Sequence, residues 1–191
     1  DGVSGSALRF YGKNFVRYPA ADTAAGRIAG LDEITVEAWI RLLAAGRGAG
    51  AVVSVQNAFS LEAGADTVGA SICAGTNVAP AQLSARAILA EGQWHHVALA
   101  YDGKLARLFL DGRRIAESDK VAGGLRSDSR GAVYAGASMS GRGNFIGDID
   151  EVLATEITYG LAQAAGPAFG LALKGVDVFG SNRPHTLYAG V

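Results

Sequence analysis

The 191-residue chain contains one cysteine, so it cannot form an internal disulfide. Neither sign of charge prevails, because 17 Lys and Arg stand against 18 Asp and Glu and give a formal net charge of −1. This balance excludes a broad electrostatic contact with nucleic acid or an anionic membrane. The chain also lacks an apolar run of about 18 residues, so we expect no membrane insertion through a helix.

The first five residues, Asp-Gly-Val-Ser-Gly, lack the basic start and the apolar stretch of a signal peptide. A chain can begin after a processed segment or at the edge of an excised domain, so this absence does not decide where the parent protein acts. A lone cysteine fits a cytosolic protein and an exported bacterial protein equally well.

Glycine is abundant, with 27 residues, and the chain is 49% hydrophobic and only 18% charged. This composition argues against disorder and favours frequent turns. Short apolar runs broken by Gly, Asp-Gly or Asn recur about every eight to twelve residues, which is typical of an antiparallel sandwich or barrel. The strands predicted from alternation and turn residues are 7–10, 14–17, 34–42, 50–56, 59–63, 68–73, 82–88, 94–101, 105–110, 113–117, 132–137 and 145–153.

The clearest local pattern is a three-stranded meander over residues 94–117. Asp102-Gly103 and Asp111-Gly112 separate alternating apolar segments, and both residue types tolerate the positive φ of tight hairpin turns. We therefore assign Gly103 and Gly112 a structural role. Beyond the meander, the sequence predicts a short helix over 159–165 and weak alternation over 169–179.

Five segments carry a resemblance to a known family. They are 7–12 (ALRFYG), 34–40 (ITVEAWI), 92–103 (GQWHHVALAYDG), 108–112 (LFLDG) and 145–152 (FIGDIDEV). In this order they resemble the laminin-G-like jelly-roll family of the concanavalin A-like lectin/glucanase superfamily. The resemblance implies an all-β, two-sheet antiparallel jelly-roll sandwich over residues 1–155. It also implies a non-catalytic module of extracellular or cell-surface proteins, which binds glycans or proteins and in some members calcium.

The Trp94-His95-His96 segment invites a metal-binding interpretation, which the geometry of a strand disfavours. Adjacent side chains face opposite sides of a sheet, so the two histidines cannot easily share one ion. We interpret this segment as part of the packed sandwich. The residues with a predicted structural role are Trp39, Trp94, His96, Gly103, Gly112 and Glu151.

Asp148 and Asp150 share one face of their predicted strand, and two carboxylates on one face need a compensating group. The resemblance implies a calcium ion that joins Asp150, with Asp148 beside it, to the start of the chain. The alternative is structural: Asp150 and Glu151 cap loop backbone or pair with Arg9 or Arg17. Calcium takes six to eight oxygen ligands, so one strand cannot supply the site alone and other segments would have to contribute. Both interpretations therefore stay open.

A glycoside hydrolase is the least favoured alternative, although Asp148 and Asp150 begin an acceptable arrangement of carboxylates. Glycoside hydrolases of this superfamily carry carboxylates along one strand, but Leu153 and Ala154 occupy the positions three and four after Asp150. We also find no nucleophile elbow and no phosphate-binding loop. Cys73, alone in an apolar strand, is expected to be an inert core residue.

Ligand contacts are expected in the loops, where an exposed aromatic side chain can act with polar neighbours. The candidates that we commit to are Tyr11, Asn14, Arg142 and Asn144, with Tyr18, Asn57 and Asn77 as weaker ones. Asn and Gly also serve turns, so each candidate has a structural alternative.

Residues 156–191 lie beyond the resemblance and form a C-terminal extension with several aromatic residues and little charge. Such a segment either adds strands to its own sandwich or contacts another subunit. The second case supports an alternative function, a self-assembling subunit of a filament, surface layer or capsid decoration.

Overall fold

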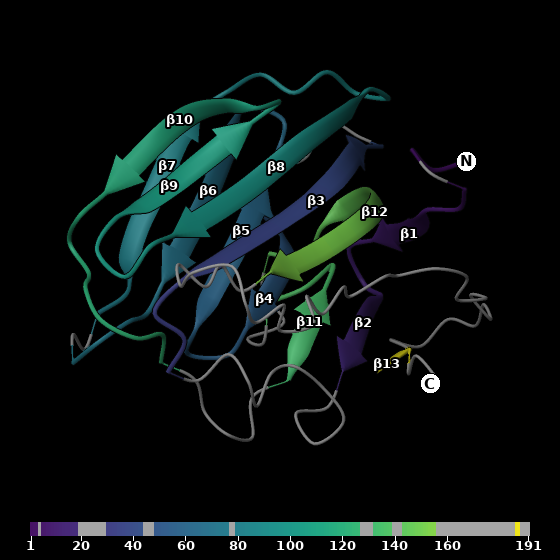
Figure 1. Cartoon of the computed structure of the whole chain (residues 1–191). Coiled ribbons are helices and arrows are strands. Elements are labelled where there is room, and N and C mark those ends of the chain that lie inside the picture. Colours follow the sequence, from purple (N-terminus) through teal and green to yellow (C-terminus); the bar gives the residue numbers. More distant parts are fainter. Residues whose placement is uncertain are drawn as a thin grey trace.

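The computed structural model describes residues 1–3, 5–18, 30–43, 48–76, 79–126, 132–138, 143–155 and 186–187. These residues form two β-sheets packed face to face (Figure 1). The six-stranded sheet has the order β1 (Leu8–Tyr11), β12 (Ile146–Thr155), β3 (Ile34–Leu42), β8 (Trp94–Tyr101), β9 (Ala106–Leu110) and β10 (Arg113–Ser118). The seven-stranded sheet has the order β13 (Thr186–Leu187), β2 (Phe15–Tyr18), β11 (Val133–Ala135), β4 (Gly50–Val55), β5 (Phe59–Ala63), β6 (Thr67–Ile72) and β7 (Ala81–Arg86).

The predicted two-sheet antiparallel sandwich is therefore confirmed, with one addition. The pairing of β13 with β2 is parallel, whereas the other described pairings are antiparallel. Among the described residues there is no helix, and hence none long and apolar enough to cross a membrane. The helix expected over 159–165, the alternation expected over 169–179 and most of the extension 156–191 lie outside the described residues.

The core lies between the sheets because alternate residues of each strand point inward. In β3, Ile34, Val36, Ala38 and Ile40 have no exposed surface, whereas the residues between them are half-buried. This period of two is what a strand with one core-facing side requires. The large side chains of Phe10, Tyr101 and Phe145 fill the space between the layers.

The predicted meander is present as β8, β9 and β10, but its two turns differ. Asp111 and Gly112 form a two-residue turn with φ of 49° and 75°. The first connection is a four-residue loop, 102–105, because the Asp102 carboxylate accepts the N–H groups of Lys104 and Leu105. Gly103 in this loop has a φ of 82°.

The first two strands do not form a hairpin, although only three residues separate them. β1 pairs with β12 in the six-stranded sheet, and β2 pairs with β11 in the other. The chain crosses between the layers at Gly12, whose N–H donates to the Phe145 carbonyl and whose φ is 75°.

One side chain covers the free edge of β1. Asn14 Oδ1 accepts the Tyr11 N–H at 2.7 Å, and Asn14 Nδ2 donates to the Arg9 carbonyl at 2.8 Å. A side-chain amide thus makes the two hydrogen bonds that a neighbouring strand would make, at an edge that could otherwise pair with another chain.

Replacing Asn14 with Ala should open this edge. We expect a loss of about 1 kcal/mol in the free energy of unfolding and association that increases with protein concentration, because an N–H and a C=O become unpaired. Light scattering over a concentration series, with chemical unfolding in parallel, measures both effects. Asn14→Asp is the matched control, since it keeps the acceptor for Tyr11. An Ala variant as monomeric as the unaltered protein would contradict the assignment.

Candidate functional site

Asp148 lies at the centre of an ion-pair cluster on the outward face of the six-stranded sheet. Its carboxylate is buried, and it accepts hydrogen bonds from Arg9 on β1 and Arg41 on β3, with shortest distances of 2.7 Å for each. Burial acts to raise the pKa of Asp148, but the bonds from the two guanidinium groups outweigh it and hold the pKa below its usual value. Arg41 also lies over the Trp94 ring, 4.7 Å from its centroid.

This geometry bears on the calcium hypothesis. Both oxygens of Asp148 already accept arginine N–H groups, so this carboxylate does not fit a cation. Asp150 lies against the start of the chain, since Oδ2 accepts the Val3 N–H at 2.8 Å and Oδ1 accepts the Glu151 N–H. No group of three or more His, Cys, Asp or Glu residues in the described ranges could hold a metal. Calcium at Asp150 stays a prediction.

Glu151 occupies a β-bulge in β12. The register with β3 shifts between Asp150 and Leu153, and Glu151 adopts a φ of 46°, which is rare for a residue with a side chain. The predicted structural residue thus sits where β12 changes direction beside the buried Asp150.

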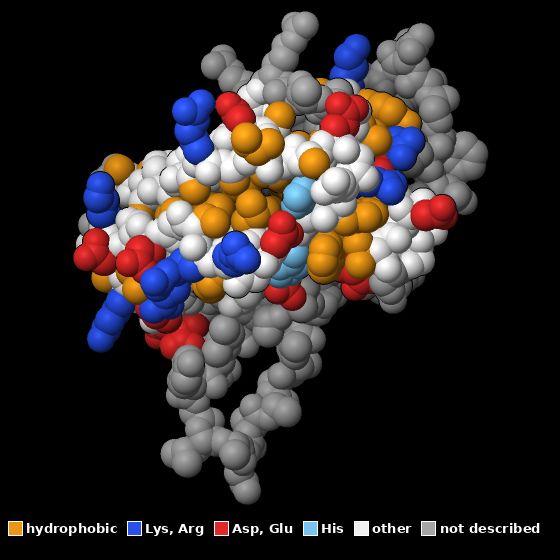
Figure 2. All heavy atoms as spheres, turned by 90° about the horizontal axis from the view of Figure 1, so that it is seen from above, with side chains coloured by type: hydrophobic (Ala, Val, Ile, Leu, Met, Phe, Trp, Pro, Cys, Tyr) orange, Lys and Arg blue, Asp and Glu red, His pale blue; other side chains and the backbone are white. Residues whose placement is uncertain are grey.

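The two histidines of β8 face opposite sides of their sheet, in line with the strand geometry. His96 points outward, with Nε2 at 3.4 Å from Glu37 and its ring at 5.2 Å from the ring of Trp39. His95 Nδ1 lies 2.9 Å from the Asp111 carboxylate, which also accepts the His96 N–H. Figure 2 shows histidine side chains beside acidic ones near the middle of the face in view. The two imidazole rings therefore contact different carboxylates, Asp111 for His95 and Glu37 for His96.

Three of the predicted ligand residues come together at one end of the sandwich. Tyr11 is 62% exposed, whereas Asn14 holds the edge of β1 and Asn144 Nδ2 donates to the Gly12 carbonyl at 3.1 Å. The amides thus serve the turn and leave Tyr11 as the exposed member. Arg142 and Asn77 lie outside the described residues, and the side chain of Tyr18 is also not described.

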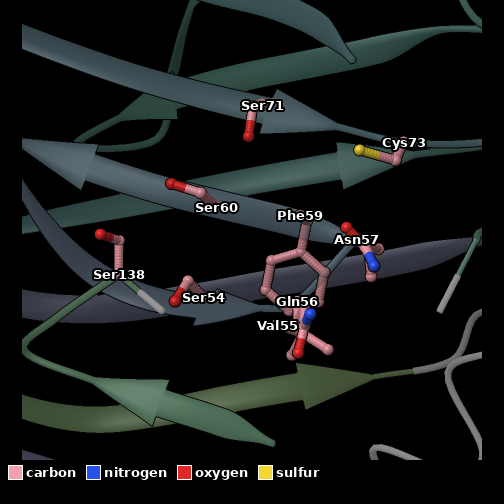
Figure 3. Close-up of a pocket in the computed structure, with 10 residues that line it drawn as sticks. Ser54, Val55, Gln56, Asn57, Phe59, Ser60, Ser71, Cys73 and Ser138 are labelled. Atoms are coloured by element: carbon pink, nitrogen blue, oxygen red, sulfur yellow. The ribbon is translucent and has the colours of Figure 1, made fainter. Parts of the chain in front are cut away.

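A pocket of about 220 Å³ lies on the other sheet. It is lined by residues 54–60 with Ser71, Cys73 and Ser138, and we call it the serine pocket (Figure 3). Ser54, Ser60 and Ser71 form a row, because Ser54 pairs with Ser60 across β4 and β5, and Ser60 pairs with Ser71 across β5 and β6. Their neighbours along each strand are buried, so this row occupies the outward face.

The pocket is walled by two further segments. The 137–138 segment closes one side, and Ser54 Oγ donates to the Ala137 carbonyl at 3.0 Å. The turn between β4 and β5 closes one end, where Asn57 adopts a φ of 59°. None of the lining residues is Asp, Glu, Lys, Arg or His. The polar side chains of the pocket are therefore hydroxyl and amide groups and the thiol of Cys73.

Cys73 lines this pocket, which corrects its expected place in the core. It follows β6 and is half-buried, and burial raises the pKa of its thiol above the usual value. The thiol is therefore protonated and weakly reactive at neutral pH. The prediction of low reactivity agrees with this environment, whereas the prediction of a core position is wrong.

The serine row is not apparent from the sequence alone. Each of the three serines lies between two apolar residues, in Val-Ser-Val, Phe-Ser-Leu and Ala-Ser-Ile. That alternation indicates an outward-facing polar side chain, but only the strand register places the three side by side. Asn57, one of the weaker candidates, does line the pocket.

Comparisons with known proteins agree with this fold. A family model described as the concanavalin A-like lectin/glucanases superfamily (Laminin_G_3) matches residues 16–157. A search of curated proteins finds no match. Among solved structures, domains LG4-5 of the mouse laminin α1 chain have a TM-score of 0.59 at 14% identity, over 80% of this chain and 41% of that one.

Two other solved structures show the same sandwich. The SAP-like pentraxin of Limulus polyphemus has a TM-score of 0.52 at 17% identity, over 68% of this chain and 66% of that one. The CBM40 of the Ruminococcus gnavus IT-sialidase, bound to α2,3-sialyllactose, has a TM-score of 0.60 at 22% identity, over 75% and 85% respectively. This chain thus spans less than half of the laminin fragment, and likeness at such identities shows the fold alone.

Replacing Asp148 with Asn should lower the free energy of unfolding at neutral pH by about 3 kcal/mol, because two arginines lose their buried counter-charge. The folded-state pKa of Asp148 is lowered, so the carboxylate stabilises the fold above its unfolded pKa of about 4 and this contribution is lost as the pH falls through the folded value. Chemical unfolding at pH 7 and below pH 4 measures both effects. The exposed Asp119→Asn is the control, and equal stability of the two variants would contradict the assignment.

Proposed function

The chain belongs to the laminin G-like family of the concanavalin A-like lectin/glucanases superfamily, and on this premise we propose that it is a non-catalytic module that binds a glycan in the serine pocket. The observation that carries the proposal is the row of three serine hydroxyls on an outward sheet face, with the amides of Gln56 and Asn57 at its end. Convergent hydroxyl and amide groups are what a ligand rich in hydroxyls requires.

The size of the pocket supports recognition of one sugar unit. Its volume of about 220 Å³ lies below the roughly 300–1,000 Å³ of typical small-molecule sites. The row crosses three strands and so extends over about 10 Å. We propose that a single terminal sugar occupies the pocket, with the rest of the glycan outside it.

A binding role fits the chemistry of the pocket better than a catalytic one. Hydrolysis of a glycosidic bond requires two carboxyl groups on either side of the bond, and the pocket is lined by none. Asp148 and Asp150, the acidic pair of β12, belong to the other sheet and are bound to arginines and backbone amides.

The setting that we propose is extracellular or at the cell surface. The similar structures include laminin domains and a carbohydrate-binding module bound to sialyllactose. Together with the family membership, they support a glycan or protein ligand that is found outside the cell or on its surface. A self-assembling role through strand addition has less support at two of the four sheet edges, because β13 pairs with β2 and Asn14 occupies the edge of β1.

Replacing Ser71 with Leu should fill the pocket and weaken glycan binding at least about tenfold, because a large apolar side chain displaces the ligand and removes a hydroxyl partner. Binding is measured first on a glycan array and then by calorimetry with the best ligand. Ser84→Leu is the matched control, since Ser84 lies on the exposed outward face of β7, away from the lining residues. If the two variants bind equally well, the serine pocket is not the site.

A further inference from the structure

We propose that the serine pocket selects a neutral sugar, which offers hydroxyl donors, over any ligand whose recognised group is an anion. The inference rests on the proposed function, because it names the class of glycan that the same pocket accepts. It is carried by the direction of two hydroxyl protons in the row.

The hydroxyl groups of Ser54 and Ser60 each donate their only proton to an acceptor within the protein. Ser54 Oγ lies 3.0 Å from the Ala137 carbonyl oxygen, and a carbonyl can only accept. Ser60 Oγ lies 2.6 Å from Glu62 Oε1, and an ionised carboxylate can only accept. Each hydroxyl has one donor and two lone pairs, so both serines present acceptors to the pocket.

A ligand must therefore donate to this part of the row. A sugar hydroxyl can do so, because it rotates to place its proton on either serine oxygen. A carboxylate, sulfate or phosphate group brings only acceptors and would place lone pairs against lone pairs. Its negative charge would also be repelled by the Glu62 carboxylate, which accepts the hydrogen bond from Ser60.

The remaining polar groups do not reverse this preference. The amides of Gln56 and Asn57 and the hydroxyl groups of Ser71 and Ser138 each carry both donors and acceptors, so they serve either class of ligand. The two amides lie with Cys73 towards one end of the pocket, whereas the hydroxyl oxygens of Ser60 and Ser138 lie towards the other (Figure 3).

Two cations lie near the pocket without lining it. Arg126 is exposed. Its backbone N–H donates to the Cys73 carbonyl at 2.9 Å, which places this residue at the Cys73 end of the pocket. Arg17 lies two strands away from Ser54, because Tyr134 of β11 pairs with both residues. Its Nε donates to the Tyr134 hydroxyl at 3.3 Å. Water screens the charge of the exposed Arg126, and Arg17 is half-buried and two strands from the row, so direct hydrogen bonds within the pocket decide the preference.

The test uses an array of paired glycans, each neutral member beside a counterpart that ends in a sialic acid, a uronic acid or a sulfated sugar. We expect the neutral members to bind at least about tenfold more tightly, with an affinity that does not change between low and high salt. Tighter binding of the acidic members, or binding that weakens with salt, overturns the inference and leaves the proposed function standing. An array on which nothing binds overturns both.

Glu62→Gln tests the cause of the selection. The Gln amide can donate to Ser60, which frees the Ser60 proton for the ligand, so the preference for neutral over acidic members should fall about threefold to tenfold. Glu117→Gln is the matched control, because Glu117 pairs with Arg114 on β10 of the other sheet. Melting temperatures establish that both variants fold. An unchanged preference in Glu62→Gln refutes the role of the hydroxyl direction.

Discussion

The buried carboxylate of Asp148 connects parts of the chain that are far apart in sequence. It binds Arg9, 139 positions earlier, and Arg41, 107 positions earlier, and so joins β1, β12 and β3 side by side. A buried charge is tolerated only when its partners satisfy it, and the four N–H contacts from two guanidinium groups do so. Asp148 lies directly opposite Arg41 where β12 pairs with β3, and the bulge at Glu151 follows it along β12.

The two outward faces of the sandwich have different compositions and serve different ends. On the six-stranded sheet, long side chains interact across the strands, through the arginines at Asp148, the contact of Arg41 with Trp94 and the contact of His96 with Trp39. On the seven-stranded sheet, three small serines leave room above the backbone. The first face carries interactions that stabilise the fold, and the second contains the pocket that we propose as the ligand site.

Much of the fold could be predicted from the sequence, because its determinants are local. The alternation of Ile34 to Leu42 defines β3, and Asp111-Gly112 defines a tight turn, since both patterns depend on neighbouring residues alone. The proposed binding site could not be predicted in the same way. The serine row requires the register of three strands, and the two arginine partners of Asp148 follow only from the pairing of β12 with β1 and with β3. A residue such as Asn14 has two plausible roles in the sequence, and only the edge position of β1 decides between them.

The serine row contributes its side chains to the surface and its backbone to the sheet, and this separation has an evolutionary consequence. The position of the row is fixed by strand pairing, and core residues such as Phe59 also line the pocket, whereas the three serines take no part in the hydrophobic core cluster. Substitutions at Ser60 and Ser71, which are half-buried on the outward face, can therefore change which ligand the proposed site recognises while the folding free energy stays nearly constant. Ligand specificity and stability can then be selected independently, and one sandwich can give rise to receptors for many ligands.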